Sequence, residues 1–476
     1  MSDELMPDAT AIAEAAGVPV TEAAAEAIDL RLSHRAERQR RLVLSIGSAL
    51  LTRPLSLMIP LITLPLFLRY LGNEGYGLYE ALGAMAMWLG QSTFGIGMGL
   101  MNKLTACHVS GDRAEARSYV STVFFAEVFI ACIGILIICA AVPWIPWKSI
   151  FPVSNSALAG QIQWAALAIG ITMLVGAMVD TPSAIYCAYQ ELYTNNIWDA
   201  AIRILILVSS FAVVHTRWEI VGVVLVINGV PILLRIINMI WLLGWHKPWL
   251  RPAISLFRWS FLSSTLSQGI VFFCLNASLL AIYQSDKLVI GLVLSASQVT
   301  AYALLGRLFL VAYGVLMMVL APLWPAYGEA VRRSDLAWVR RHVSLTLFLG
   351  FALILGFGAL MLLRGNWIVR VWTHGQPVVI SKSLVLAFTA MFLARAWVDC
   401  RSVVLNSSEV LKPQVWFFVI HAALNLALSI PMAKLFGVEG VAWCAPATAI
   451  ATTLWGYPWM MRKHVYRGRS LGAATF

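Results

Sequence analysis

Long apolar runs separated by short polar segments fill the chain from residue 42 to residue 461. A helix of about 20 apolar residues crosses the hydrocarbon core of a bilayer, and the runs have roughly this length or more. The pattern predicts twelve transmembrane helices, at 42–70, 78–102, 118–142, 160–186, 197–214, 220–243, 259–293, 298–323, 343–364, 382–404, 415–435 and 440–461. We therefore expect an all-α polytopic membrane protein.

The first run contains a charge deep in its apolar sequence. Arg53 lies about eleven residues inside the run, which also holds Pro54, Pro60 and Pro65. An ionised side chain at that depth is expensive in lipid, so it is expected to face protein or water. The run therefore predicts a polar cavity between the helices.

Positive charges set the expected orientation. If the amino terminus is cytosolic, the inside segments hold twenty Lys and Arg, whereas the outside segments and outer helix ends hold eight. The positive-inside rule then places both termini in the cytosol. Residues 1–41 are expected to form a flexible cytosolic tail with a helix possible over 28–41, and residues 462–476 form a second tail.

Composition excludes several classes of protein. Hydrophobic residues make up 60% of the chain and charged residues 12%, with a mean hydropathy of +0.79, so a water-soluble globule is ruled out. No G-x-x-x-x-G-K-[ST] phosphate loop is present. The outer loops are too short to carry a catalytic domain, which argues against a membrane polymerase or glycosyltransferase.

The two halves of the chain resemble one another. An offset of 223 residues pairs Tyr79 with Tyr302 and Asp112 with Asp335, along with several neighbours of each. Six helices are therefore expected to repeat once, as an N-terminal lobe (42–243) and a C-terminal lobe (259–461) joined by a cytosolic linker (244–258). Such pseudo-symmetric bundles enclose a central cavity and work by rocking of the two lobes.

Five motifs carry a family resemblance: RYLGNEGYGLYE, SGDRAEARSYV, SDKLVIGLVLSASQVTAY, LWPAYGEAVRRSDLAWVRR and LFGVEGVAW. In these the chain resembles the Wzx-type polysaccharide flippases of the multidrug/oligosaccharidyl-lipid/polysaccharide (MOP) exporter superfamily. The resemblance covers nearly all of residues 40–465. It implies two six-helix bundles that open alternately to the two sides of the membrane.

The resemblance also implies a function. Such a protein moves an undecaprenyl-diphosphate-linked oligosaccharide repeat unit from the cytosolic to the periplasmic leaflet of a bacterial inner membrane. The product feeds O-antigen of lipopolysaccharide, capsule or exopolysaccharide. We accordingly expect a transporter rather than an enzyme, with no cofactor, metal or nucleic acid. The polymerase and chain-length regulator of the same pathway are possible partners beside membrane lipids.

Arginines are the candidate substrate ligands. Arg53 and Arg307 lie well inside their spans without an acid within four positions. A guanidinium binds phosphate oxygens bidentately, so these two, with Arg395 in support, are predicted to hold the diphosphate. By analogy, related lipid II flippases carry a cavity-facing arginine in the first helix, where Arg53 stands. Asp199 with Arg203, and Arg395 with Asp399, are spaced to form ion pairs along one helix face.

Two acids and three tryptophans complete the candidate site. Glu127 and Asp286 are predicted to couple transport to an ion. A partner arginine on a neighbouring helix would explain Glu127 equally well, and solvation at the interface is the default explanation for Asp286. Trp88, Trp164 and Trp397 are predicted either to stack on sugar rings or to pack between helices.

Two related functions remain as alternatives. A peptidoglycan-precursor (lipid II) flippase usually carries two helices more than this pattern predicts. A cation-coupled multidrug exporter is expected to have more acids and fewer arginines in its cavity.

Overall fold

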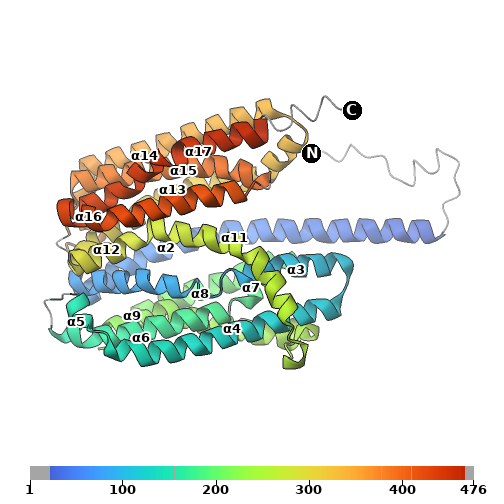
Figure 1. Ribbon diagram of the computed structural model, residues 1–476, viewed down its shortest axis with the longest axis horizontal. Helices are drawn as coiled ribbons and strands as arrows, with labels where there is room; N and C mark the ends of the chain where they lie inside the picture. Colours follow the sequence, from blue (N-terminus) through green and yellow to red (C-terminus); the bar gives the residue numbers. More distant parts are fainter. Residues whose placement is uncertain (1–21, 152, 154–155, 377, 409, 467–476) are drawn as a thin grey trace.

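The protein is described here from a computed structural model that covers residues 22–151, 153, 156–376, 378–408 and 410–466. Some side chains within these ranges, that of Arg53 among them, lie outside the description. All regular elements in this part are helical (Figure 1). In chain order they are α2 (Glu22–Leu89), α3 (Ile96–Ser110), α4 (Arg113–Ala141), η1 (Val142–Trp144), α5 (Trp147–Ile150), α6 (Ser156–Met178), α7 (Thr181–Ala188), α8 (Leu192–Val213), α9 (Glu219–Val224), η2 (Leu225–Gly229), α10 (Val230–Trp241), η3 (Leu242–His246), η4 (Pro248–Leu250), η5 (Ile254–Leu256), α11 (Trp259–Tyr283), α12 (Ser285–Val293), α13 (Ala296–Arg332), α14 (Leu336–Trp372), α15 (Lys382–Ser407), α16 (Lys412–Ala451), α17 (Thr453–Met460) and η6 (Met461–Tyr466).

The helices have the length and composition of membrane spans. Within the described residues, nine helical stretches are long and apolar enough to cross a bilayer, or ten if the bent α11 counts as one span. One of these stretches runs for 55 residues from Lys412 to Tyr466, or roughly 80 Å at 1.5 Å per residue. Because the hydrocarbon core is about 30 Å thick, a single crossing cannot account for it. The expected count of twelve stays a prediction.

Glycines turn the longest helices. Gly72 inside α2 and Gly437 inside α16 have non-helical backbone angles, with φ of 72° and 65°. This left-handed region suits glycine, which lacks the Cβ that clashes there. We call the end of the bundle at which α2 breaks the Gly72 end, and the opposite end, which carries residues 244–258, the linker end.

Breaks also interrupt three of the predicted spans. The span expected at 78–102 is divided between α2 and α3 by a turn that ends at Gly95, and the one at 160–186 between α6 and α7. The span at 259–293 is divided between α11 and α12. Short helices joined by bends leave backbone polar groups unpaired, which at membrane depth is tolerated only beside other protein or a cavity.

Two groups of helices lie side by side. Figure 1 shows α13 to α17 together on one side and α2 to α10 on the other, with α11 running between them. The start of α3 packs closely against α11, because a Cβ on either Gly95 or Gly269 would overlap the backbone of the other. The arrangement agrees with two bundles, while their exact boundaries stay as predicted from the sequence.

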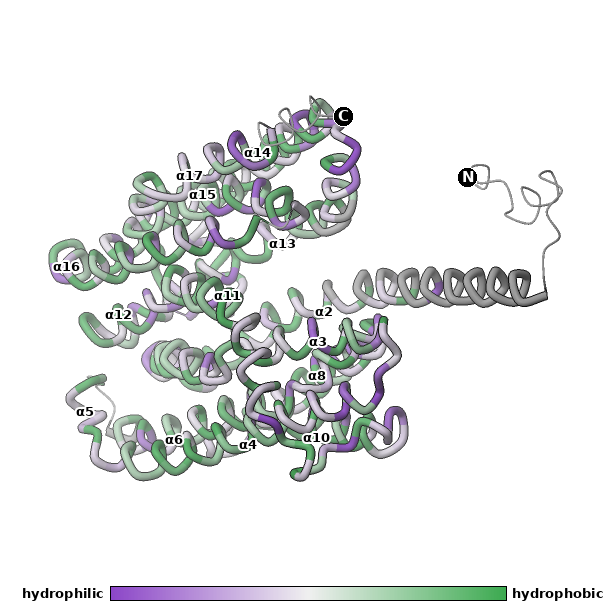
Figure 2. Tube along the Cα trace, turned by 45° about the vertical axis from the view of Figure 1, so that its right-hand side comes forward, coloured by the Kyte–Doolittle hydropathy of each residue, from purple (hydrophilic) through white to green (hydrophobic). Residues whose placement is uncertain are grey.

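The surface is apolar along the bundle and polar at one end. Large side chains such as Leu136, Trp164, Phe348 and Leu363 are more than 60% exposed. Figure 2 shows hydrophilic residues gathered mainly toward the linker end, with hydrophobic residues along the helices. This is the distribution of a protein whose solvent is lipid along the bundle and water at its ends.

The internal repeat has a structural counterpart. Asp112 caps α4 by accepting a hydrogen bond from the backbone N–H of Glu115 at 2.8 Å. Asp335 caps α14 in the same way, with the N–H of Trp338 at 3.0 Å. Asp112 and Asp335, which the 223-residue offset pairs, therefore have the same role in both halves. Each N-cap carboxylate accepts a hydrogen bond from a backbone N–H that the first turn leaves unpaired.

Candidate functional site

A cavity of about 220 Å³ lies between the two groups of helices. The second part of α2 contributes one wall, and α13 and α15 contribute much of the other. Tyr79 and Tyr302, which the repeat pairs, both line it. The charged side chains that line it are Glu80, Lys287, Arg307 and Arg395.

Glu80 joins the two lobes at this cavity. Its side chain is 5% exposed, and Oε2 lies 2.7 Å from Nζ of Lys287, while Oε1 lies 3.5 Å from a guanidinium nitrogen of Arg307. The hydroxyl of Tyr76 donates to Oε1 at 2.7 Å. Both cations come from the other lobe, so a buried carboxylate is neutralised across the lobe interface.

Arg395 lies farther along the same wall and is held by its own lobe. Its Nε is 3.6 Å from Oδ2 of Asp399, and the guanidinium lies 4.6 Å and 4.7 Å from the ring centres of Tyr283 and Tyr313. The hydroxyl of Tyr313 donates to the same Asp399 oxygen. The i,i+4 ion pair expected from the sequence is thus present, and the two rings fix a cation at the cavity wall.

The lining residues have a positive balance. Three cations, Lys287, Arg307 and Arg395, face one carboxylate, Glu80, among the residues that line the cavity. Arg307 keeps 38% of its side chain exposed and so retains donors that are not committed to Glu80. The arrangement can bind an anion more readily than a cation.

At the Gly72 end the cavity is closed by contacts between the lobes. The hydroxyl of Thr300 donates to the carbonyl of Asn73 at 2.6 Å. One turn farther along α2, a Cβ on Gly77 would overlap the carbonyl oxygen of Ala296, so only glycine allows this approach. Glu80 and Lys287 form the next contact inward.

The predicted diphosphate ligands are placed as follows. Arg307 and Arg395 both line the cavity. Arg53 lies in α2, and its side chain is outside the described part of the structure. The cavity also has two charged residues that the prediction did not include, Glu80 and Lys287.

The predicted coupling acids do not line the cavity. Glu127 is buried in α4 and accepts a hydrogen bond from the Thr181 hydroxyl at 2.7 Å. Asp286 is fully buried in α12 and accepts from the Tyr302 hydroxyl at 2.6 Å and from Nδ2 of Asn425 at 3.5 Å. Asp286 is therefore buried in protein, and the alternative expectation that it is solvated at an interface is wrong. Whether either acid couples transport to an ion stays a prediction.

The three tryptophans also lie apart from the cavity lining. Trp164 is 63% exposed and Trp88 is 36% exposed. Trp397 donates its indole N–H to the carbonyl of Leu454 at 2.9 Å and lies under the guanidinium of Arg401, 3.5 Å from the ring centre. Sugar stacking by these side chains stays a prediction.

A second polar cavity of about 220 Å³ adjoins the first; it is lined mainly by the N-terminal lobe and shares Tyr79, Glu80 and Arg307 with the first cavity. Asp199 and Arg203 line this cavity, but no ion pair between them occurs among the described contacts. Arg235 instead pairs with Asp180 at 3.3 Å. The local spacing of Asp199 and Arg203 was therefore not enough to predict a bond.

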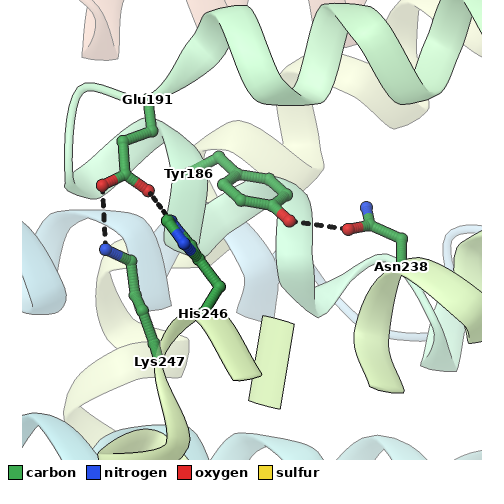
Figure 3. A network of polar contacts seen from close by, with 5 residues as sticks. All are labelled: Tyr186, Glu191, Asn238, His246 and Lys247. Carbon is green, nitrogen blue, oxygen red and sulfur yellow. Dashed lines mark hydrogen bonds and ion pairs between the residues drawn. The ribbon is translucent and has the colours of Figure 1, made fainter. Parts of the chain in front are cut away.

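A different buried carboxylate fixes the linker to the N-terminal lobe (Figure 3). Glu191, between α7 and α8, lies 2.9 Å from Nζ of Lys247 and 3.0 Å from Nε2 of His246. Beside it, the Tyr186 hydroxyl donates to Oδ1 of Asn238 at 2.6 Å. Burial alone would raise the pKa of Glu191, but the hydrogen bonds from Lys247 and His246 outweigh it and hold the pKa below the ordinary value.

Sequence reasoning missed Glu80 and Lys287 for identifiable reasons. Lys287 lies close to the end of the predicted span at 259–293, and Glu80 lies at the start of the predicted span at 78–102, so neither is a charge deep inside a span. The useful signal was the adjacency of Glu80 to Tyr79, since the repeat pairs Tyr79 with the cavity-lining Tyr302. No group of three or more His, Cys, Asp or Glu in the described residues is arranged to hold a metal ion.

Comparisons with known proteins fit this geometry. No protein-family model matches the chain. A proposed O-antigen export protein of Yersinia pseudotuberculosis is 23% identical over 432 residues, which is 89% of this chain and 97% of that protein. A proposed O-antigen transporter of Salmonella typhi is 22% identical over 433 residues, which is 88% and 95% of the two chains.

Solved structures decide the fold. An inward-facing multidrug resistance transporter of the MATE family, in the MOP superfamily, matches with a TM-score of 0.69 at 12% identity, over 90% of this chain and 99% of that one. The chain has the fold of the MOP superfamily. The lipid II flippase MurJ, in an inward closed conformation, matches with a TM-score of 0.62 at 14% identity, over 88% of each chain. The MOP fold expected from the motifs is thus confirmed.

Proposed function

We propose that this protein is a flippase for a lipid-linked oligosaccharide whose headgroup is an anionic diphosphate. The observation that carries the proposal is the cavity between the lobes, with Lys287, Arg307 and Arg395 against a single lining carboxylate. The O-antigen export and transport proteins at 22–23% identity support the same substrate class.

A diphosphate suits these side chains. It presents several oxygens with at least two negative charges, and guanidinium groups bind such oxygens with paired N–H donors. At membrane depth the attraction is only weakly screened by water. Arg53, Arg307 and Arg395 are proposed to hold the headgroup while the polyprenyl chain stays in lipid.

Transport is proposed to follow rocking of the lobes about the cavity, from the cytosolic to the periplasmic leaflet of a bacterial inner membrane, with both chain termini in the cytosol. The proposed step forms and breaks no covalent bond, so the protein acts as a transporter rather than an enzyme. The polymerase and chain-length regulator of the pathway are proposed to take up the product.

Ion coupling is proposed at Asp286 rather than Glu127. Tyr302 and Asn425 contact the Asp286 carboxylate, and Oδ1 of Asn425 has no hydrogen-bond partner among the described contacts. Carboxylate and amide oxygens are ligands that a hard cation prefers. Substrate flipping measured with and without a sodium gradient tests this point, and an Asp286→Asn variant should abolish any dependence on sodium.

The cavity disfavours cationic drugs, because three lining cations would repel them. Lipid II also carries a diphosphate, so a lipid II flippase remains the alternative substrate class. The two are distinguished by the saccharide, not by the charged part of the cavity.

A leaflet assay tests the proposal. The full chain is reconstituted in vesicles with a fluorescent undecaprenyl-diphosphate-linked saccharide, and a membrane-impermeant reductant bleaches only the outer leaflet. Protein-dependent bleaching of the inner-leaflet pool is expected for a repeat-unit saccharide, and lipid II should be moved poorly. Equal rates in protein-free vesicles would refute a flippase, and faster movement of lipid II would favour the alternative.

A further inference from the structure

Glu80 occupies the position in which an anionic headgroup would bind. Its oxygens contact Lys287 Nζ at 2.7 Å and Arg307 at 3.5 Å, and both cations line the cavity. A substrate diphosphate that used these two side chains would have to take them from Glu80. The protein thus carries an internal carboxylate that competes with its own substrate.

The same contact holds the lobes together. From the Gly72 end inward, α2 touches the other lobe at Asn73, then at Gly77, then at Glu80. The contacts at Asn73 and Gly77 involve no charged group, so they can break by a small movement of the lobes, with water taking up the freed hydrogen bonds. The third cannot be broken simply, because separating the lobes there would leave a buried carboxylate and a buried ammonium unpaired.

We propose that Glu80 is an exchangeable counter-ion, which the diphosphate of the substrate displaces from Lys287 and Arg307, and that this exchange frees the Gly72 end to open. The inference rests on the proposed function and adds to it a rule for when the lobes separate. An empty cavity keeps the ion pairs and stays closed at that end.

The geometry gives an order to the exchange. Arg307 is 38% exposed whereas Lys287 is 14% exposed, so Arg307 is the accessible first contact for an incoming anion. The diphosphate then reaches Lys287 with its second phosphate and leaves Glu80 bonded to Tyr76, 2.7 Å away. Neutral and cationic molecules offer nothing to replace the carboxylate, so the exchange also selects for anions.

Two variants with opposite expectations test the exchange. Glu80→Gln keeps the shape and one acceptor oxygen but removes the competing charge, while Lys287→Gln breaks the same pair from the cationic side. Glu191→Gln is the matched control, because it removes a buried carboxylate whose partners are a lysine and a histidine at the linker end. The probe is farnesyl diphosphate, with uncharged farnesol as its control.

The measurements are calorimetric binding of the probe to the full chain in detergent and amide hydrogen exchange in peptides that span 71–84 and 294–304. Wild type should bind the diphosphate, ignore farnesol, and exchange faster in both peptides when the probe is bound. Glu80→Gln should exchange fast without the probe and bind it roughly tenfold more tightly, as expected if pairing leaves about a tenth of the cavities competent. Lys287→Gln should also exchange fast but bind more weakly.

Each result has a distinct meaning. Binding by Glu80→Gln that is equal to or weaker than that of wild type overturns the exchange, even if wild type binds and flips its substrate. Slow exchange in both Glu80→Gln and Lys287→Gln, at wild-type thermal stability, also overturns it. If wild type binds no diphosphate at all, the proposed function itself fails, which is a separate outcome. Glu191→Gln should behave as wild type in both assays.

Discussion

Two buried carboxylates, Glu80 and Glu191, have similar surroundings but take their partners from different parts of the molecule. Each is 5% to 6% exposed and each lies close to two basic side chains. Glu80 takes its partners, Lys287 and Arg307, from the other lobe, more than two hundred residues away in sequence. The partners of Glu191 come from the linker, 55 and 56 residues away.

The difference shows how one kind of bond can serve two purposes. The Glu191 cluster joins the linker to the N-terminal lobe and includes no residue of the C-terminal lobe, so we expect it to stay intact during transport. Under the proposed rocking of the lobes, the pair of Glu80 with Lys287 would have to break in every transport cycle, and a replacement anion would be needed. A cavity with surplus cations next to Glu80 provides for that replacement.

The largest effect on transport is expected at Arg307. Arg307→Ala removes a cavity cation and leaves Glu80 with one charged partner, so flipping should fall by about thirtyfold or more, the equivalent of ~2 kcal/mol. The leaflet assay checks the rate. Arg401→Ala is the control, since Arg401 contacts Trp397 away from the cavity lining, and its flipping rate should stay close to that of wild type. Equal losses in both variants would contradict a special role for the cavity arginine.

Breaking the other carboxylate should harm stability instead. Glu191→Ala leaves Lys247 buried without its carboxylate, and the free energy of unfolding should fall by about 3 kcal/mol, seen as a lower unfolding temperature in detergent. Affinity for farnesyl diphosphate should not change. The exposed pair of Glu329 with Arg333 supplies the control, because Glu329→Ala should cost less than about 0.5 kcal/mol. A loss of affinity for farnesyl diphosphate in Glu191→Ala would contradict the assignment of a purely structural role to Glu191.

Acid should release the linker cluster in a defined direction. Because the folded pKa of Glu191 is below its ordinary value of 4.5, the ionised carboxylate stabilises the fold at every pH above that value. The contribution is lost as the pH falls below 4.5 through the folded pKa. Unfolding temperatures from pH 7 to pH 3 should therefore fall more steeply for wild type than for Glu191→Gln, and parallel curves would contradict the assignment.

The smallest effects should be equal in the two lobes. Asp112→Ala and Asp335→Ala each remove one helix N-cap and should each lower the free energy of unfolding by about 1 kcal/mol. Asp112→Asn and Asp335→Asn should stay within a few tenths of wild type. Unequal losses would show that the two halves use the repeated aspartate differently.

Much of the fold could be predicted from the sequence because it depends on local signals. Apolar runs located the helices, and the offset that paired Asp112 with Asp335 found two caps with the same role. The ion pair of Arg395 with Asp399 was predicted from its i,i+4 spacing. These features are set by residues a few positions apart, which is the range over which a single sequence is informative.

The charged site could be predicted only in part. Two of the three predicted arginines, Arg307 and Arg395, line the cavity. The partners of Glu80 lie 207 and 227 positions away from it, and no local spacing reveals them. The same limit appears at Arg235, whose partner is Asp180 on another helix. Glu80 was visible as an acid in a span, but its function depends on which lobe supplies the opposing charges.

One structure tests the central claim most directly. The full chain in lipid nanodiscs, bound to an undecaprenyl-diphosphate-linked saccharide, is solved by electron cryomicroscopy. We predict diphosphate density against Lys287, Arg307 and Arg395, with the Glu80 carboxylate moved out of contact with Lys287. Diphosphate density elsewhere, or an intact bond from Glu80 to Lys287 beside a bound headgroup, would contradict the account.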